Sequence, residues 1–263
     1  MRFAVAALVF VAFAAPAARA QLPQAYTYDF RLEEGRGGEV TTGTVRVSGD
    51  RARVDVDSRK DDPEYFLLAD GGRTLYVVHP ERRTAERHDG DAFASIVGTG
   101  LRAASPVVQF TMREFSIDTL RLGDGGLVAG RRTQRSGVQE QWRLTMRAMG
   151  IVEEEMRGRA SSTFWTDPTL PLMRNPVYDI VHSAMYAMAS SDKRFSDASQ
   201  ATNRALARGG LLKADVTYES GDGDRERLRY EVTRITPGAV DAASLLLPKD
   251  YRVETPSVSH IKM

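Results

Sequence analysis

Residues 44–57 read TVRVSGDRARVDVD and decide the fold class. Val45 and Val47 alternate with polar residues, and after two turn residues the same alternation resumes at Ala52 and Val54. A period of two places apolar side chains on one face of a strand and polar side chains on the other. Gly49-Asp50 between the two runs predicts a tight turn, so the stretch predicts an antiparallel hairpin with one buried face.

The same alternation extends along most of the chain. Residues 26–32 place Tyr26, Tyr28, Phe30 and Leu32 on one side, and similar runs cover 139–148, 213–218 and 228–232. Turn signals recur about every ten residues, which predicts roughly ten to twelve strands in an all-antiparallel sheet. Turns are expected at 124–126 and 221–224, and Gly137 is expected to separate a strand over 128–135 from one over 139–148.

Three stretches change to helical spacing. They are residues 91–103, a run that starts at Asn175 with Pro176 in the first turn, and a run from Ser196 to Arg208 that ends before two glycines. Asn is a favourable N-cap and Pro suits the first helical position. The chain is therefore expected to be mainly β, a curved antiparallel sheet or incomplete barrel, with two or three helices covering its concave face.

The first twenty residues indicate export. A positive start at Arg2 precedes an apolar run from Phe3 to Ala15, and a small-x-small pattern ends at Ala20. These are the features of a cleaved signal peptide, and the apolar run is too short to span a bilayer comfortably. We expect one domain over 21–263 with a helical insertion at about 175–208, located in the periplasm or secreted. Gln21 rather than cysteine at the cleavage point predicts no lipid anchor, and no membrane-spanning segment is expected.

Composition excludes several classes of function. The formal net charge of the chain is +1, and the predicted leader carries two arginines and no acid, so the remainder is nearly neutral. A near-neutral chain has no bulk field to recruit nucleic acid. The chain has no cysteine, which excludes thiol catalysis and cysteine metal sites. We expect a monomer without a cofactor.

No group of residues predicts a reaction. His79 and His88 flank a turn and would form a modest metal site with Glu86 or Asp89, but two surface histidines near a loop are favoured. His182 and Ser183 are adjacent on a predicted helix and point apart, and no nucleophile elbow follows. The acids at 222–226 fit a hairpin turn better than a calcium loop. The sequence therefore predicts no catalytic residue, no metal site and no enzyme.

Two sets of residues are candidates for binding. Large inward side chains and a methionine-rich helix could line an apolar cavity, because methionine adapts to irregular apolar ligands. Arginines on two adjacent strands could meet phosphate headgroups or an acidic protein, although pairing with Glu140 and nearby acids is the alternative. The candidate lining residues are Tyr28, Phe30, Trp142, Leu144, Met185 and Met188, and the candidate partner-binding residues are Arg131, Arg143 and Arg147.

The order of these elements resembles the LolA/LolB family of periplasmic lipoprotein-localisation proteins. The matching pieces are the leader, the strands 43–47 and 51–55, the segments 68–80 and 91–103, and the segments 165–171 and 247–251. That family is an incomplete antiparallel barrel with helices lining its hollow. The resemblance covers most of residues 25–253 and implies binding of acyl chains or of a hydrophobic partner.

Three functions follow as hypotheses. The first is an exported, non-enzymatic protein that binds a lipid or acyl chain in a half-barrel cavity. The second is a structural or envelope-assembly module whose barrel is filled and whose basic outer face meets an envelope protein. The third, ranked last, is a hydrolase with a site that the sequence does not reveal.

Overall fold

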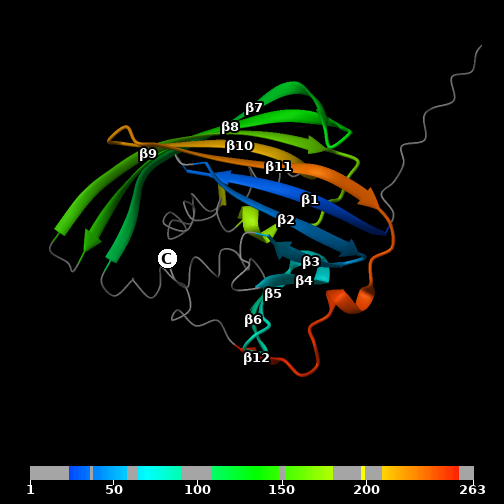
Figure 1. Ribbon diagram of the computed structural model, residues 1–263. Helices are drawn as coiled ribbons and strands as arrows, with labels where there is room; N and C mark the ends of the chain where they lie inside the picture. Colours follow the sequence, from blue (N-terminus) through cyan, green and yellow to red (C-terminus); the bar gives the residue numbers. More distant parts are fainter. Residues whose placement is uncertain are drawn as a thin grey trace, which may run out of the picture.

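One open sheet of twelve strands forms the protein in the computed structural model, which describes residues 24–35, 38–57, 64–89, 108–148, 152–179, 197–198 and 209–254. The sheet curves strongly, so that β7–β10 arch above β3–β6 and β12 (Figure 1). The strands are β1 Ala25–Glu34, β2 Glu39–Ser48, β3 Arg51–Val56, β4 Tyr65–Ala69, β5 Thr74–His79, β6 Thr84–Asp89, β7 Val108–Val128, β8 Arg131–Ala148, β9 Val152–Asp167, β10 Gly210–Ser220, β11 Arg225–Pro237 and β12 Arg252–Glu254.

Neighbouring strands follow the order β12-β6-β5-β4-β3-β2-β1-β11-β10-β9-β8-β7. The β1–β11 pair joins an early half of the chain to a late half, with Phe30 opposite Val232 and Leu32 opposite Tyr230. The mainly β, open architecture confirms the coarse expectation. The all-antiparallel expectation is wrong at one place, because β12 pairs with β6 in parallel and returns the C-terminal segment to the edge of the sheet.

The predicted hairpin is confirmed as β2 and β3. Val45 lies opposite Val54, and Val47 lies opposite Ala52, and these four side chains are at most 2% exposed. Gly49 takes a positive φ of 60° in the turn. The alternation of the sequence therefore predicted both the register of this pair and its buried face.

The long strands β7, β8 and β9 differ from the prediction. Residues 124–126 form a bulge inside β7 instead of a turn, and the chain turns at Ala129-Gly130, where both φ angles are positive. Gly137 lies within β8 instead of ending it, since it pairs with Leu120 of β7 and with Thr163 of β9. The turn predicted at residues 124–126 is a bulge, because Asp and Gly are favoured in bulges as well as in turns.

The concave face of the central strands is covered by residues 170–178. Tyr26 Oη donates to the carbonyl of Pro171 at 3.2 Å, and Tyr28 Oη donates to that of Met173 at 3.0 Å. These contacts belong to a central core, defined here by the following buried residues: Tyr26, Tyr28, Phe30, Leu32, Val45, Val47, Ala52, Val54, Phe66, Leu68, Leu75, Val128, Leu170, Tyr178, Leu212, Ala214, Val216, Leu228, Tyr230 and Val232.

The expected helices are described in part. Asn175 caps the start of the predicted helix, since its Oδ1 accepts a hydrogen bond from the Val177 amide at 3.0 Å. Helical backbone within the described residues covers 176–179 and 197–198, which is less than the two or three helices expected. Residues 91–103 and most of 175–208 lie outside the described residues, as do the predicted leader and His182.

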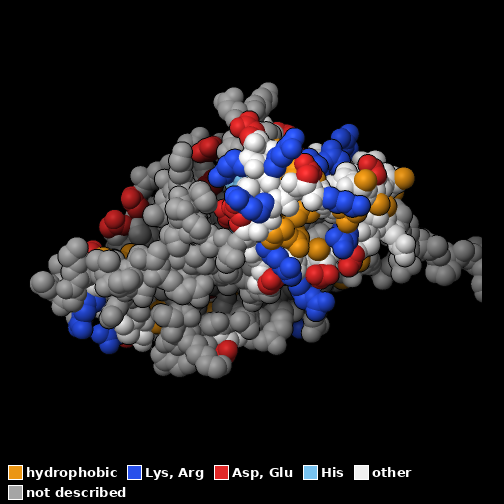
Figure 2. Space-filling view, turned by 90° about the horizontal axis from the view of Figure 1, so that it is seen from below, with side chains coloured by type: hydrophobic (Ala, Val, Ile, Leu, Met, Phe, Trp, Pro, Cys, Tyr) orange, Lys and Arg blue, Asp and Glu red, His pale blue; other side chains and the backbone are white. Residues whose placement is uncertain are grey.

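The convex face of β4–β6 has a core of its own. Tyr65, Leu67, Val78 and Ala85 are buried there against Leu247 and Tyr251 of the C-terminal segment. Basic and acidic side chains are interspersed around a small group of hydrophobic atoms on the face shown in Figure 2. No helix in the described part of the chain has the length and apolar character needed to cross a bilayer.

Candidate functional site

The candidate lining residues fall into two separate regions. Tyr28 and Phe30 are each 1% exposed and belong to the central core, where residues 170–178 cover them. Trp142 and Leu144 lie on the same concave face but in the arm of the sheet formed by β7–β9. Met185 and Met188 lie outside the described residues. The structure therefore brings the four described candidates together as two separate pairs, one in the central core and one in the arm.

A second apolar cluster lies in this arm, and we call it the arm cluster. Leu144 and Met112 are buried within it, 3% and 6% exposed, while Trp142 and Phe115 are only partly buried. The Trp142 indole lies directly over Gly158, where an added Cβ would come within 2.3 Å of it. The members of the arm cluster are Met112, Phe115, Ile117, Trp142, Leu144 and Met156.

Polar groups lie beside the arm cluster on the concave face. Glu140 and Tyr218 flank Ala160, which pairs with both across β8–β9–β10. Glu140 is 7% exposed, and burial, followed by the nearby charge of Glu140, raises the pKa of Tyr218 well above its usual value. The sequence placed Glu140 among the acids near the arginines. In the structure Glu140 lies on the concave face, because even-numbered residues of β8 face inward, whereas Arg131, Arg143 and Arg147 are odd-numbered.

The three predicted arginines lie on the convex face, since they are odd-numbered residues of β8. Arg131 Nε donates to Asp167 Oδ2 at 2.9 Å, and Arg143 lies 3.8 Å from Glu114 and 3.7 Å from Glu155. Arg147 is exposed. Burial alone would raise the pKa of Asp167, but hydrogen bonds from Thr169 and Arg131 outweigh it and lower that pKa. Arg131 is therefore paired with an acid, as the alternative for these arginines predicted, and Arg143 lies near two acids at longer distances.

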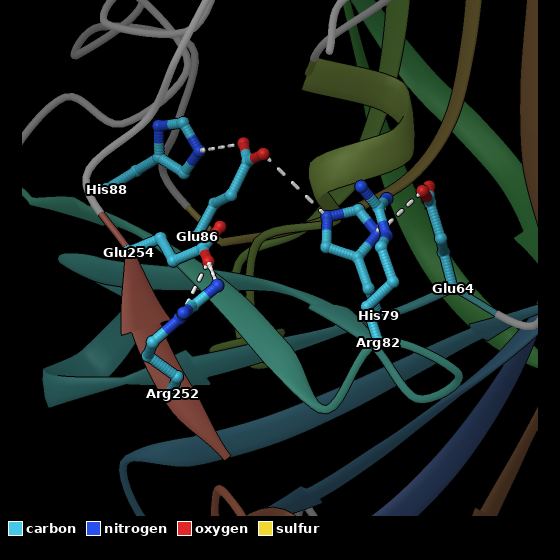
Figure 3. Close-up of polar contacts among 7 residues, drawn as sticks. All are labelled: Glu64, His79, Arg82, Glu86, His88, Arg252 and Glu254. Carbon is cyan, nitrogen blue, oxygen red and sulfur yellow. Dashed lines mark hydrogen bonds and ion pairs between the residues drawn. The ribbon is translucent and has the colours of Figure 1, made fainter.

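A histidine cluster, formed by Glu64, His79, Arg82, Glu86 and His88, lies at the end of β4–β6 (Figure 3). His79 Nδ1 lies 2.9 Å from Glu64 Oε1 and 2.9 Å from Arg82 Nη2. The Glu86 carboxylate lies between the two imidazoles, 3.8 Å from His79 Nε2 and 3.9 Å from His88 Nε2. Imidazole and carboxylate therefore alternate along one row of side chains.

Both histidines are buried, 6% exposed for His79 and 4% for His88, so the expectation of surface histidines is wrong. Burial, the largest cause, lowers the pKa of His88 against an opposing effect of Asp89. Nδ1 of His79 lies within hydrogen-bond reach of both Glu64 and Arg82, and whether it donates or accepts depends on the tautomer of the ring. Within this cluster it is therefore the pKa of His88 that burial lowers.

The histidine cluster depends on pairing that the sequence does not display. Residues 79 and 84 are opposite in β5–β6, and this register turns His79, Glu86 and His88 to one face. Glu64 precedes β4 and carried no signal in the sequence. No group of three or more His, Asp or Glu side chains in the described ranges is arranged to hold a metal ion.

Comparisons with known proteins give distant structural neighbours. No family model matches the chain, and no curated protein matches it. An uncharacterised conserved protein from Thermus thermophilus aligns with a TM-score of 0.38 and 10% identity, over 89% of this chain and 91% of that one.

One of these neighbours belongs to the superfamily that the sequence resembles. A LolA superfamily protein from Nitrosomonas europaea aligns with a TM-score of 0.31 and 8% identity, over 86% of this chain and 92% of that one. Scores this low assign no family to the chain.

Proposed function

We propose that this chain is an exported, non-enzymatic protein that binds a lipid-like or hydrophobic moiety on the concave face of its sheet. The observation that carries the proposal is the arm cluster. Trp142, Phe115 and Met156 are only partly buried there, on an open sheet and apart from the central core. Apolar side chains that remain partly accessible on a concave surface are typical of sites for apolar ligands.

The composition of the arm cluster supports the same proposal. Two methionines and two aromatic side chains supply a deformable, polarisable surface, which suits acyl chains of varying shape. Export, predicted from residues 1–20, would place the protein where acyl chains and lipoproteins cross the envelope. The resemblance to the LolA/LolB family proposes the same class of ligand.

Binding of a dansyl-labelled undecanoic acid to the purified protein tests the proposal. We expect saturable fluorescence enhancement, and native mass spectrometry should show co-purified lipid. Trp142→Ala should weaken binding by about fivefold or more, because it removes most of an aromatic side chain from the contact area. Trp165→Ala is the control, since Trp165 lies outside the arm cluster, beneath Lys213. A wild-type protein that binds no probe and carries no lipid would refute this function.

The filled central core beneath the concave face favours a second function. Tyr28 and Phe30 are fully buried, so this part of the hollow is filled with side chains. A filled scaffold suits an envelope-assembly module that meets a partner protein through its convex face. Charge reversal at Arg143 and Arg147 would then abolish capture of that partner while leaving probe binding unchanged.

A further inference from the structure

A pocket of about 480 Å³ lies on β7–β10, and its lining includes Phe115 and Trp142 of the arm cluster together with charged residues of the opposite face. Its charged lining side chains point to the convex face, because they occupy alternate positions in register across neighbouring strands. The lining residues are Glu114, Phe115, Ser116, Gln141, Trp142, Arg143, Arg157, Gly158, Arg159, Glu219, Ser220 and Gly221.

Three arginines line this pocket, and two of them, Arg143 and Arg157, lie close enough for their charges to repel each other. Arg143 and Arg157 are directly opposite each other on β8 and β9. Like charges at directly opposed positions of one sheet face repel each other and destabilise the pair. A third guanidinium, that of Arg159, lies two residues further along β9 on the same face.

The available acids do not neutralise this group fully. Arg159 pairs with Glu219 at 2.6 Å, but Arg225 shares that carboxylate at 2.7 Å. The hydrogen bond from Arg159 is the largest cause of the lowered pKa of Glu219. Arg143 meets its two carboxylates at the long distances of 3.7 and 3.8 Å.

Arg157 is the least satisfied of the three. Its position on β9 faces Gly221, the residue after β10, where an added Cβ would lie 2.6 Å from Arg157 Cγ, so no acidic side chain occupies that place. Among the described residues Arg157 makes no hydrogen bond or ion pair through its side chain. A planar donor that is unpaired, repelled by its neighbour and set in a pocket is arranged for an external anion.

We propose that this pocket binds a phosphate group, held between Arg143 and Arg157 with Arg159 at its rim. The guanidinium fork matches two phosphate oxygens, and Ser116 adds a hydroxyl to the lining. The charged side chains that carry the proposal alternate with Phe115 and Trp142 along their strands, so Arg157 can be replaced without removing an apolar side chain of the arm cluster. The phosphate can belong to a small soluble compound or to a lipid headgroup, and the two sources share this chemistry.

Titration calorimetry with inorganic phosphate, together with co-sedimentation on vesicles of phosphatidylglycerol and of phosphatidylcholine, tests the proposal. Arg157→Gln should weaken binding by about tenfold, as expected for losing charge-assisted hydrogen bonds. Arg135→Gln is the matched control, because it removes one charge from an exposed side chain on the same face of β8, outside the pocket. Thermal melts should show that both variants fold.

The outcomes separate the sources. Calorimetric binding of inorganic phosphate that depends on Arg157 supports the pocket and a soluble ligand. Binding to phosphatidylglycerol vesicles alone, again dependent on Arg157, supports the pocket and a lipid headgroup. Absence of both interactions overturns the proposal, as does an equal loss in Arg135→Gln, which would show general charge attraction. None of these results depends on binding of the fatty-acid probe.

Discussion

At the scale of single residues, two glycines make room for aromatic rings on the concave face. Gly43 lies opposite Phe30 in the β1–β2 pair, and Gly158 lies opposite Trp142 in the β8–β9 pair. In each case the ring covers the backbone where a side chain would otherwise stand. Close ring-to-backbone packing of this kind explains why a glycine is placed inside a strand despite its poor strand propensity.

Gly43→Ala should destabilise the protein. The added Cβ would come within 2.3 Å of the Asp55 carbonyl oxygen and 2.7 Å of the Phe30 ring, so backbone must move. Overpacking a core in this way costs about 1–3 kcal/mol. Urea unfolding measures the change, and Gly238→Ala is the control because nothing lies within 4 Å of its added Cβ. Equal stability of the two variants would contradict the packing described for Phe30.

At the scale of elements, the C-terminal segment stabilises the opposite face of the sheet. The 3-10 helix η2 (Ala242–Leu245) leads to Leu247 and Tyr251, which pack on β4–β6, and β12 then pairs in parallel with β6. Arg252 of β12 also bonds to Glu254 beside the histidine cluster (Figure 3). The outer face of these strands is therefore completed by residues distant from them in sequence.

Two adjacent leucines test this role. Leu247→Ala should lower the free energy of unfolding by about 1–2 kcal/mol, because its partly buried side chain packs against the core that contains Tyr65 and Leu67. Leu246→Ala should be nearly neutral, since Leu246 is 48% exposed. Denaturant unfolding of both variants gives the comparison. A similar cost for the two substitutions would show that the C-terminal segment does not cover this core.

At the scale of the whole molecule, the curved sheet separates three environments. Its centre is sealed by residues 170–178, its arm carries the arm cluster on the concave face, and the arginine-lined pocket lies on that arm. The histidine cluster lies at the far end of the sheet from the arm. The proposed ligand sites and the buried His88, whose pKa is lowered, thus lie at different ends of one sheet.

Global stability should fall as the pH drops below about 6.5, the usual pKa of histidine. Burial lowers the pKa of His88 in the folded state, so the unfolded chain binds the proton more readily. Stability therefore rises with pH through this window and is lost on acidification. Urea unfolding between pH 5 and pH 8 measures the slope, and His88→Gln should flatten it. An unchanged slope in that variant would assign the effect to other groups.

The sequence by itself determined the class of the fold and much of its local geometry. Alternation fixed the β2–β3 register at Val45 and Val54, and the Asn175-Pro176 pair marked the start of a helix, because both signals are local in sequence. Where a local signal fits two structures, the prediction can be wrong. The turn predicted at residues 124–126 is a bulge, since Asp and Gly favour bulges and turns alike.

Only the tertiary structure decided which of these residues act together. It buried Tyr28 and Phe30 beneath residues 170–178, grouped Trp142 with Leu144, and opposed Arg143 to Arg157. It also joined Glu64, which precedes β4, to His79 at the end of β5, a proximity that depends on the register of the β4–β5 pair. Such contacts arise when distant segments pair and the sheet curves, and neither the pairing partner nor the curvature is encoded in the period of a single strand.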